Sequence, residues 1–349
     1  MQTHELPMIL FTVLSQMSVG AFLALGVVQT LAVSRYSSTT IDRLADPALL
    51  AIGPTLVAGF LASMFHMNDV TNTINVLRHW NSSYLSREII VGMAFAGLGF
   101  VFTVMQWRRM GSPGLRRALA LVTAAVGVLL VWVQSMVYYS LVTVPAWNTW
   151  ATPLRFFATT VLLGSLAVGV AFAWNIVRAE RAAPQEDEEA SAEQDGPADT
   201  GGAPAAESRP ARGGGLAMLV RPAALTTSER ESATELTRTS LRVVSAVATT
   251  VALVIVVSLP LYLAGLAQEG SRAALASGET FDGVFFIMRM GLLVVGAVVL
   301  SLVTFRLAAD RHSTSSRLTL LVSVALVVCF VSEIMGRSIF YESMIRIGM

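Results

Sequence analysis

Three ionisable side chains, His66, Arg87 and Glu88, lie at the ends of two long apolar runs. His66 ends the run that closes with "FLASMFHMND" (60–69), and Arg87 and Glu88 open the run that begins within "SSYLSREIIVGM" (82–93). If both runs are helices, adjacent residues point about 100° apart, so Glu88 can face a bundle interior while Arg87 faces away from it. His66 and Glu88 are therefore candidate proton acceptors in an apolar setting.

A second pair of charges, Glu333 and Arg337, lies near the end of the last apolar run. Their spacing of four residues is the spacing at which a helical ion pair forms. The pair therefore has a structural interpretation that is as good as a functional one.

The chemistry that these residues could support is the oxidation of a lipid-soluble quinol, which releases two protons and two electrons. His66 and Glu88 would accept hydrogen bonds from the hydroxyl groups and then the protons. Aromatic side chains would hold the flat ring, and those at the same level are Trp80, Tyr84, Trp147, Trp150, Phe156, Phe157, Phe340 and Tyr341. Each of these aromatics, taken alone, is more often part of the interfacial belt of a membrane protein.

The electrons would need an acceptor outside this polypeptide. The only cysteine is Cys329, and the only histidines are His4, His66, His79 and His312, none of which pairs with another as a bis-histidine haem requires. We therefore expect no haem and no iron–sulfur cluster in this chain.

The composition predicts that helices in a membrane position these residues. The chain has 349 residues, 54% of them hydrophobic and only 13% charged, and all of its basic residues are arginine. Soluble domains carry about 25% charged residues, so the fold class is all-α, integral membrane. Eight apolar runs are long enough to span a membrane, which takes roughly 20 residues. They are 8–33, 46–66, 85–107, 116–139, 152–177, 241–267, 283–306 and 317–339.

The arginines predict that both termini lie outside. With that orientation 17 of the 24 arginines fall in inner segments and 7 in outer ones, and 9 against 7 remain without the long central loop. The segment 108–117, "RRMGSPGLRR", is the strongest single indication.

The middle of the sequence divides the spans. Residues 180–215 are acidic and rich in Pro and Gly, a composition that predicts a disordered linker. We therefore expect membrane helices in 1–179, a cytoplasmic linker with a helical extension (226–240) in 180–240, and membrane helices in 241–349. Two related four-helix bundles are one arrangement of these spans.

The sequence resembles the membrane-anchor subunits of the dimethyl sulfoxide reductase family, within the wider DmsC/NrfD group. The matching stretches are "HELPMILFTVLSQMSVGAFL" (4–23), "GFLASMFHM" (59–67), "LRHWNSSYLSREI" (77–89), "TVPAWNTWATPLRFF" (143–157) and "SEIMGRSIFY" (332–341). Two features depart from the family pattern: "MNDVTNTIN" follows His66 without the usual Gly-Pro, and the acidic linker is unusual.

The resemblance implies a multi-pass anchor in a prokaryotic cell membrane that binds and oxidises menaquinol. It implies an iron–sulfur subunit and a molybdopterin catalytic subunit as partners, and no nucleic acid. It also assigns His66 and Glu88 to the quinol site, beside which Arg87, Trp80, Tyr84, Trp150, Glu333 and Arg337 are candidate binding residues.

Two other functions remain open from the sequence. A transporter could use Arg155 and Arg289 to bind an anion, although no charged residue lies near the midplane of a predicted span. A purely structural anchor without a quinol site is the other alternative.

Overall fold

The computed structural model describes residues 6–32, 78–194 and 227–348, together with residues 36, 48, 49, 52, 53 and 55. All elements in these residues are helices. The helices are α1 (Leu6–Ala32), α4 (Tyr84–Trp107), α5 (Pro113–Tyr139), α6 (Ala151–Gln194), α8 (Thr227–Glu269), α9 (Arg272–Glu279), α10 (Val284–Leu293), the π-helix η3 (Val294–Leu300), α11 (Ser301–Ala309) and α12 (Ser315–Glu342).

Within the described residues, seven helical segments are long and apolar enough to cross a membrane. They coincide with seven of the predicted spans, and α10, η3 and α11 together form the span predicted at 283–306. The predicted span at 46–66 lies mostly outside the described residues. The eighth crossing and the outside location of the termini therefore stay predictions.

Two helices extend well beyond the spans. Helix α6 continues to Gln194, so the first part of the segment 180–215, predicted as disordered, is helical instead. Ala, Glu and Gln dominate residues 180–194 and are strong helix formers, which outweighs the lack of apolar residues there. Helix α8 begins at Thr227, which agrees with the expected helical extension at 226–240.

Local sequence signals fix several helix starts. Ser83 caps α4 by accepting a hydrogen bond from the backbone N–H of Ser86, and Ser112 caps α5 in the same way through Leu115. Pro113 follows at the first turn of α5, where its missing N–H costs nothing. The cap at Ser83 fixes where α4 begins and therefore places Glu88 in its second turn.

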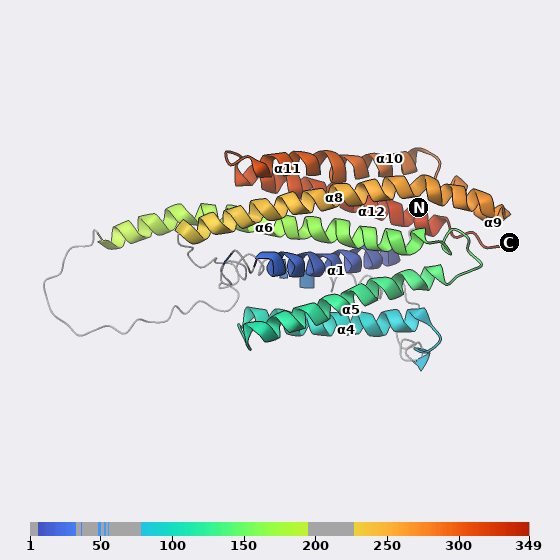
Figure 1. The fold of residues 1–349 in the computed structure, drawn as a ribbon, viewed down its shortest axis with the longest axis horizontal. Helices are drawn as coiled ribbons and strands as arrows, with labels where there is room; N and C mark the ends of the chain where they lie inside the picture. Colours follow the sequence, from blue (N-terminus) through green and yellow to red (C-terminus); the bar gives the residue numbers. More distant parts are fainter. Residues whose placement is uncertain are drawn as a thin grey trace.

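Helix α6 is the centre of the arrangement (Figure 1). It packs against α1 on one side and against α8 and α12 on the other, and α8 and α12 pack in turn on the span α10–α11. Helices α4 and α5 pack against each other on the far side of α1 (Figure 1). The last four spans thus enclose one bundle, which α1 joins to α4 and α5.

Glycines allow α1 and α6 to approach closely. A Cβ atom on Gly164 would lie 2.1 Å from the backbone carbon of Gly20, and one on Gly20 would lie 1.8 Å from the carbonyl oxygen of Thr160. Membrane helices commonly use small residues for such close backbone contacts. This crossing fixes the position of α1 between the two groups of helices.

Helices α1 and α4 start, and α12 ends, at the same end of the molecule (Figure 1). Farther along these two helices, the Phe22 ring of α1 packs against Phe95 and Phe102 of α4, with ring centroids 6.1 Å and 5.3 Å apart. The residues after α12 also lie at this end, where the backbone N–H of Ile347 donates to the carbonyl of Thr143 over 2.9 Å. We call this end of the molecule the site end.

Candidate functional site

Glu88 is enclosed by protein at the site end. It is only 8% exposed, although it lies in the second turn of a helix that has few buried apolar side chains. Its hydrogen-bonding partner is the side-chain amide of Gln134, five residues before the end of α5 at Tyr139. The phenols of Tyr138 and Tyr341 lie at the same end of the molecule, in the last turns of α5 and α12. Glu88 therefore faces inward, as the sequence predicted.

A continuous series of hydrogen-bonded side chains connects Glu88 to α12. The Nε2 atom of Gln134 donates to Ser15 Oγ over 3.0 Å, and its Oε1 atom accepts from Gln16 Nε2 over 3.1 Å. Arg337 then donates from a terminal guanidinium nitrogen to Gln16 Oε1 over 2.8 Å. Gln16, Gln134 and Ser15 are all at most 1% exposed. Four spans, α4, α5, α1 and α12, thus share one buried polar network.

Arg337 is held on its other faces by aromatic rings. Its guanidinium carbon lies 3.8 Å from the centroid of the Phe156 ring and 5.6 Å from that of Phe340. The side chain is 5% exposed. Cation–π contacts of this kind stabilise a guanidinium that has lost its water.

Glu333 forms its ion pair with an arginine of another helix, and not with Arg337 as the sequence spacing indicated. Its Oε1 atom lies 3.5 Å from a terminal nitrogen of Arg289 on α10, and its Oε2 atom accepts from Thr159 Oγ1 on α6. Arg337, four residues along, donates to Gln16 instead. Helix spacing permitted the Glu333–Arg337 pair, but packing of α10 against α12 brings a competing arginine to Glu333. Gly336 leaves room for the Arg289 guanidinium, since a Cβ atom there would lie 2.8 Å from Arg289 Nε.

A small cavity of about 20 Å³ opens beside these groups. It is lined by Arg155, Thr159, Ile255, Arg289, Glu333, Gly336, Arg337 and Phe340. Arg289 Nε is buried and has no hydrogen-bond partner. A cavity of this size holds about one water molecule, which could accept from that nitrogen. Arg155 is held by rings, with its guanidinium 4.1 Å from the Tyr262 centroid and 5.2 Å from that of Phe281.

Aromatic residues close the site end above the network. The hydroxyl groups of Tyr138 and Tyr341 share a hydrogen bond of 2.8 Å. Trp147 stacks on Phe340 with centroids 5.2 Å apart and donates from its indole nitrogen to the Phe340 carbonyl over 2.7 Å. Sequence reasoning missed Tyr138. It placed Trp147 among the aromatic residues at this level but could not predict its contacts, because a single aromatic in an apolar run carries no signal of its partners.

Four predicted binding residues lie at the site end but in other surroundings. Trp80 and Trp150 are 61% and 49% exposed, as expected for interfacial belt residues. Arg87 donates to the backbone carbonyls of Trp80 and Asn81 over 2.9 Å and 2.6 Å, and its guanidinium lies 4.8 Å from the Tyr84 ring centroid. Arg87 thus holds the segment before α4 onto the helix start. His66 lies outside the described residues, so its predicted proximity to Glu88 stays a prediction.

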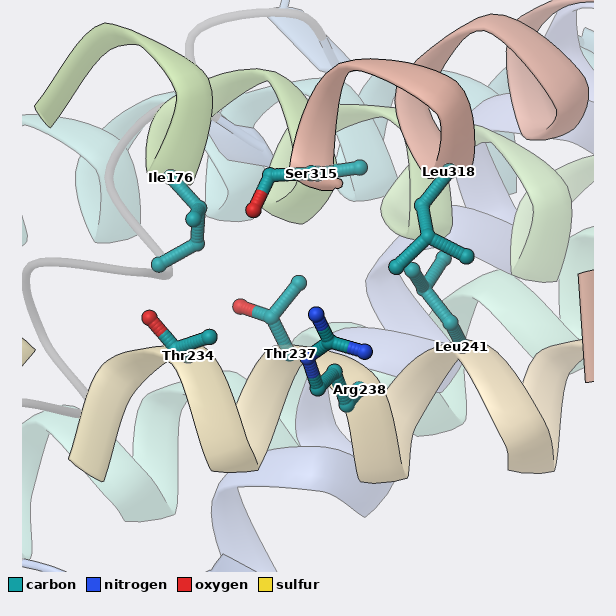
Figure 2. A pocket seen from close by; sticks show the side chains of 8 residues that line it. Ile176, Thr234, Thr237, Arg238, Leu241, Ser315 and Leu318 are labelled. Carbon is teal, nitrogen blue, oxygen red and sulfur yellow. The ribbon is translucent and has the colours of Figure 1, made fainter. Parts of the chain in front are cut away.

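The opposite end of the molecule contains a second cavity with a structural explanation. It measures about 10 Å³ and lies between α6, α8 and α12, where Figure 2 shows Thr234, Thr237, Arg238 and Leu241 on α8 facing Ile176, Ser315 and Leu318. Arg238 donates to the carbonyl of Asp310 over 2.7 Å and to Ser313 Oγ over 2.9 Å. Arg238 therefore stabilises the turn between α11 and α12, which gives it a structural role. The candidate functional site is the network around Glu88.

Among the described residues, no group of three or more His, Cys, Asp and Glu side chains could hold a metal ion. The groups that the network does offer are a carboxylate, amides, hydroxyls and guanidiniums. Such groups exchange protons and hydrogen bonds with a polar ligand.

Three curated proteins are similar to part of this sequence. It is 31% identical over 163 residues to an anaerobic dimethyl sulfoxide reductase chain of Escherichia coli, covering 47% of this protein and 56% of that one. It is 33% identical over 162 residues to the corresponding reductase chain of Haemophilus influenzae (46% and 56% covered). It is also 29% identical over 147 residues to a sulfite dehydrogenase subunit of Allochromatium vinosum (39% and 45% covered).

The match spans about half the length of these curated relatives. A family model, the DMSO reductase anchor subunit (DmsC), matches residues 1–182, which contain Gln16, Glu88 and Gln134. Because this match covers just over half of the 349 residues, the chain belongs to the DMSO reductase anchor subunit family and is a multi-pass membrane protein.

Proposed function

We propose that this protein anchors a redox enzyme to the membrane and oxidises menaquinol at the site end, with Glu88 as a proton acceptor. The observation that carries the proposal is the enclosure of Glu88, a carboxyl group that is 8% exposed and hydrogen-bonded to an amide in the family-matched part of the chain. An ionisable group inside a membrane span is costly, and its presence there argues for function.

In the proposed reaction, menaquinol loses two protons and two electrons and becomes menaquinone. Glu88 accepts a hydrogen bond from one quinol hydroxyl and then its proton, and His66 is the second candidate acceptor. In this proposal the hydroxyl groups of Tyr138 and Tyr341, which share a hydrogen bond at the site end, are further donors to a quinol oxygen.

The electrons pass to a partner in this proposal. Two relatives are named as chains of dimethyl sulfoxide reductases and one as a subunit of a sulfite dehydrogenase, so each belongs to a redox enzyme. By analogy, an iron–sulfur subunit accepts the two electrons from this protein and a molybdopterin subunit uses them. The proposed docking face for the iron–sulfur subunit is the site end, which lies outside the cell if both termini are outside.

The transporter alternative gains little from the geometry. Arg289, one of its two candidate anion-binding residues, is paired with Glu333, and Arg155 is covered by aromatic rings. The alternative of a purely structural anchor requires a separate test, since a structural anchor also binds partners.

Co-purification followed by an activity assay separates these functions. An affinity tag on this protein is expected to recover an iron–sulfur protein and a molybdopterin enzyme from mild detergent, and the complex is expected to oxidise a menaquinol analogue. Partners without quinol oxidation would identify a structural anchor. Recovery of this protein alone, together with anion uptake by vesicles that contain it, would identify a transporter.

A further inference from the structure

The network between Glu88 and Arg337 has a fixed hydrogen-bond direction, and arginine chemistry sets it. A guanidinium carries five N–H donors and no acceptor. Arg337 must therefore face the oxygen of Gln16, over the observed 2.8 Å. That leaves the amide nitrogen of Gln16 to face Gln134, over 3.1 Å, so Gln134 must offer its own oxygen there. The nitrogen of Gln134 is then left for Glu88 and Ser15.

Ser15 supports the same direction independently. Its hydroxyl proton is engaged by the carbonyl of Thr12 over 3.1 Å, so its oxygen is free to accept. Gln134 Nε2 donates to that oxygen over 3.0 Å. Both ends of the network thus require that Gln134 turn its two N–H groups toward Ser15 and Glu88.

The direction matters for the chemistry of Glu88. A carboxylate that receives an N–H donor keeps its other lone pairs free to accept a substrate proton. If Gln134 presented its carbonyl instead, Glu88 would have to carry a proton of its own in order to bond to it. A protonated Glu88 could not act as the proton acceptor.

We propose that Arg337, Gln16 and Gln134 are positioning residues that hold Glu88 as a hydrogen-bond-accepting carboxylate ready to take the quinol proton. This inference rests on the proposed function, and it assigns to α12, in the second half of the sequence, a part in a site whose acceptor lies on α4. Two neutral amides, Gln16 and Gln134, separate Arg337 from Glu88. A substitution of Arg337 therefore affects Glu88 only through Gln134.

The test compares single and double variants of the assembled complex. Gln134→Leu removes the donor to Glu88 at similar volume and is expected to lower kcat for quinol oxidation about 10-fold, the scale of one hydrogen bond to a charged group, with KM nearly unchanged. Arg337→Met is expected to lower kcat about 3-fold, a part of that effect, because Ser15 still orients Gln134. Arg337→Lys, which keeps donors and offers no acceptor, is expected to restore most of the rate.

The decisive arm is the double variant Gln134→Leu/Arg337→Met. If Arg337 acts only through Gln134, the double variant is no slower than Gln134→Leu alone. Gln106→Leu, a buried glutamine near the far end of α4, is the matched control and should oxidise quinol normally.

Two outcomes would overturn the inference while leaving the proposed function intact. One is a double variant slowed by the product of the two single effects, which would make Arg337 an independent contributor. The other is a Gln134→Leu variant at the wild-type rate while Glu88→Gln is inactive. A Glu88→Gln variant at the wild-type rate would instead remove the proposed function itself.

Discussion

The close crossing of α1 and α6 predicts that a single methyl group at Gly164 disturbs the site. The perturbation is Gly164→Ala. Its new Cβ atom would lie 2.1 Å from the Gly20 backbone carbon and 2.3 Å from the Ala21 nitrogen. These are backbone atoms of a continuous helix, so no side chain can rotate away to make room.

The size of the effect follows from contact distances. Non-bonded carbon atoms meet at about 3.5 Å or more, so α1 and α6 must separate by roughly 1.4 Å near this crossing. Overpacking of this kind costs about 1–3 kcal/mol, and more where the backbone cannot adjust. Gln16 lies one helical turn from Gly20 and on the same face of α1. A shift of α1 by this amount would lengthen the Gln16 hydrogen bonds of 2.8 Å and 3.1 Å beyond their useful range.

The assay measures thermal unfolding in detergent and quinol oxidation for the same preparations. Gly164→Ala is expected to unfold at a lower temperature and to lose most of the quinol-driven rate. Gly26→Ala on α1 is the matched control, since nothing lies within 4 Å of its added methyl group, and it should be at least as stable as wild type. A Gly164→Ala variant with unchanged stability would refute the reasoning about this crossing.

The topology, the buried ion pair and the acidic segment each allow a further test. A cysteine introduced at Ser112, in the arginine-rich turn between α4 and α5, should react with impermeant reagents only from the cytoplasm, and one near the C-terminus only from outside; labelling of residue 112 in intact cells would reverse the topology. Glu333→Leu leaves Arg289 buried without its counter-charge and should lower the free energy of unfolding by about 3–5 kcal/mol. The double variant Glu333→Leu/Arg289→Leu should recover most of that loss, and a double variant as unstable as the single one would argue against the ion pair. Deleting 196–214 from the acidic segment should leave assembly and quinol oxidation unchanged, and loss of a subunit on purification would assign that segment a partner.

Seven of the eight predicted membrane spans could be read from the sequence, because each of these apolar runs is long. Glu88 could be singled out for the same reason, since a carboxylate in such a run is conspicuous. Gln16 and Gln134 could not, because neutral amides occur in many membrane helices and their significance depends on a partner from another helix. An amide inside a membrane span does require a hydrogen-bond partner. The two glutamines, each next to a serine, were therefore the available signal of a polar contact between helices.

Local spacing was a poor guide where tertiary packing offered an alternative. Glu333 and Arg337 have the spacing of a helical pair, yet Arg289 reaches Glu333 from α10 because Gly336 leaves room for its guanidinium. Arg87 was a candidate binding residue, although helix geometry already allowed it to face away from the bundle interior. Two backbone carbonyls before α4 accept its hydrogen bonds.

The central claim is that Glu88 accepts a proton from quinol, and the ratio of two rates in Glu88→Gln tests it most directly. The first rate is turnover of the assembled complex with a menaquinol analogue, and the second is turnover with a dye that feeds electrons to the iron–sulfur subunit directly. Glutamine keeps the shape and a hydrogen-bonding amide but cannot take the proton. The quinol-to-dye ratio should therefore fall about 100-fold, the scale for loss of a general base, while the dye-driven rate stays normal. A ratio equal to that of wild type would contradict the account.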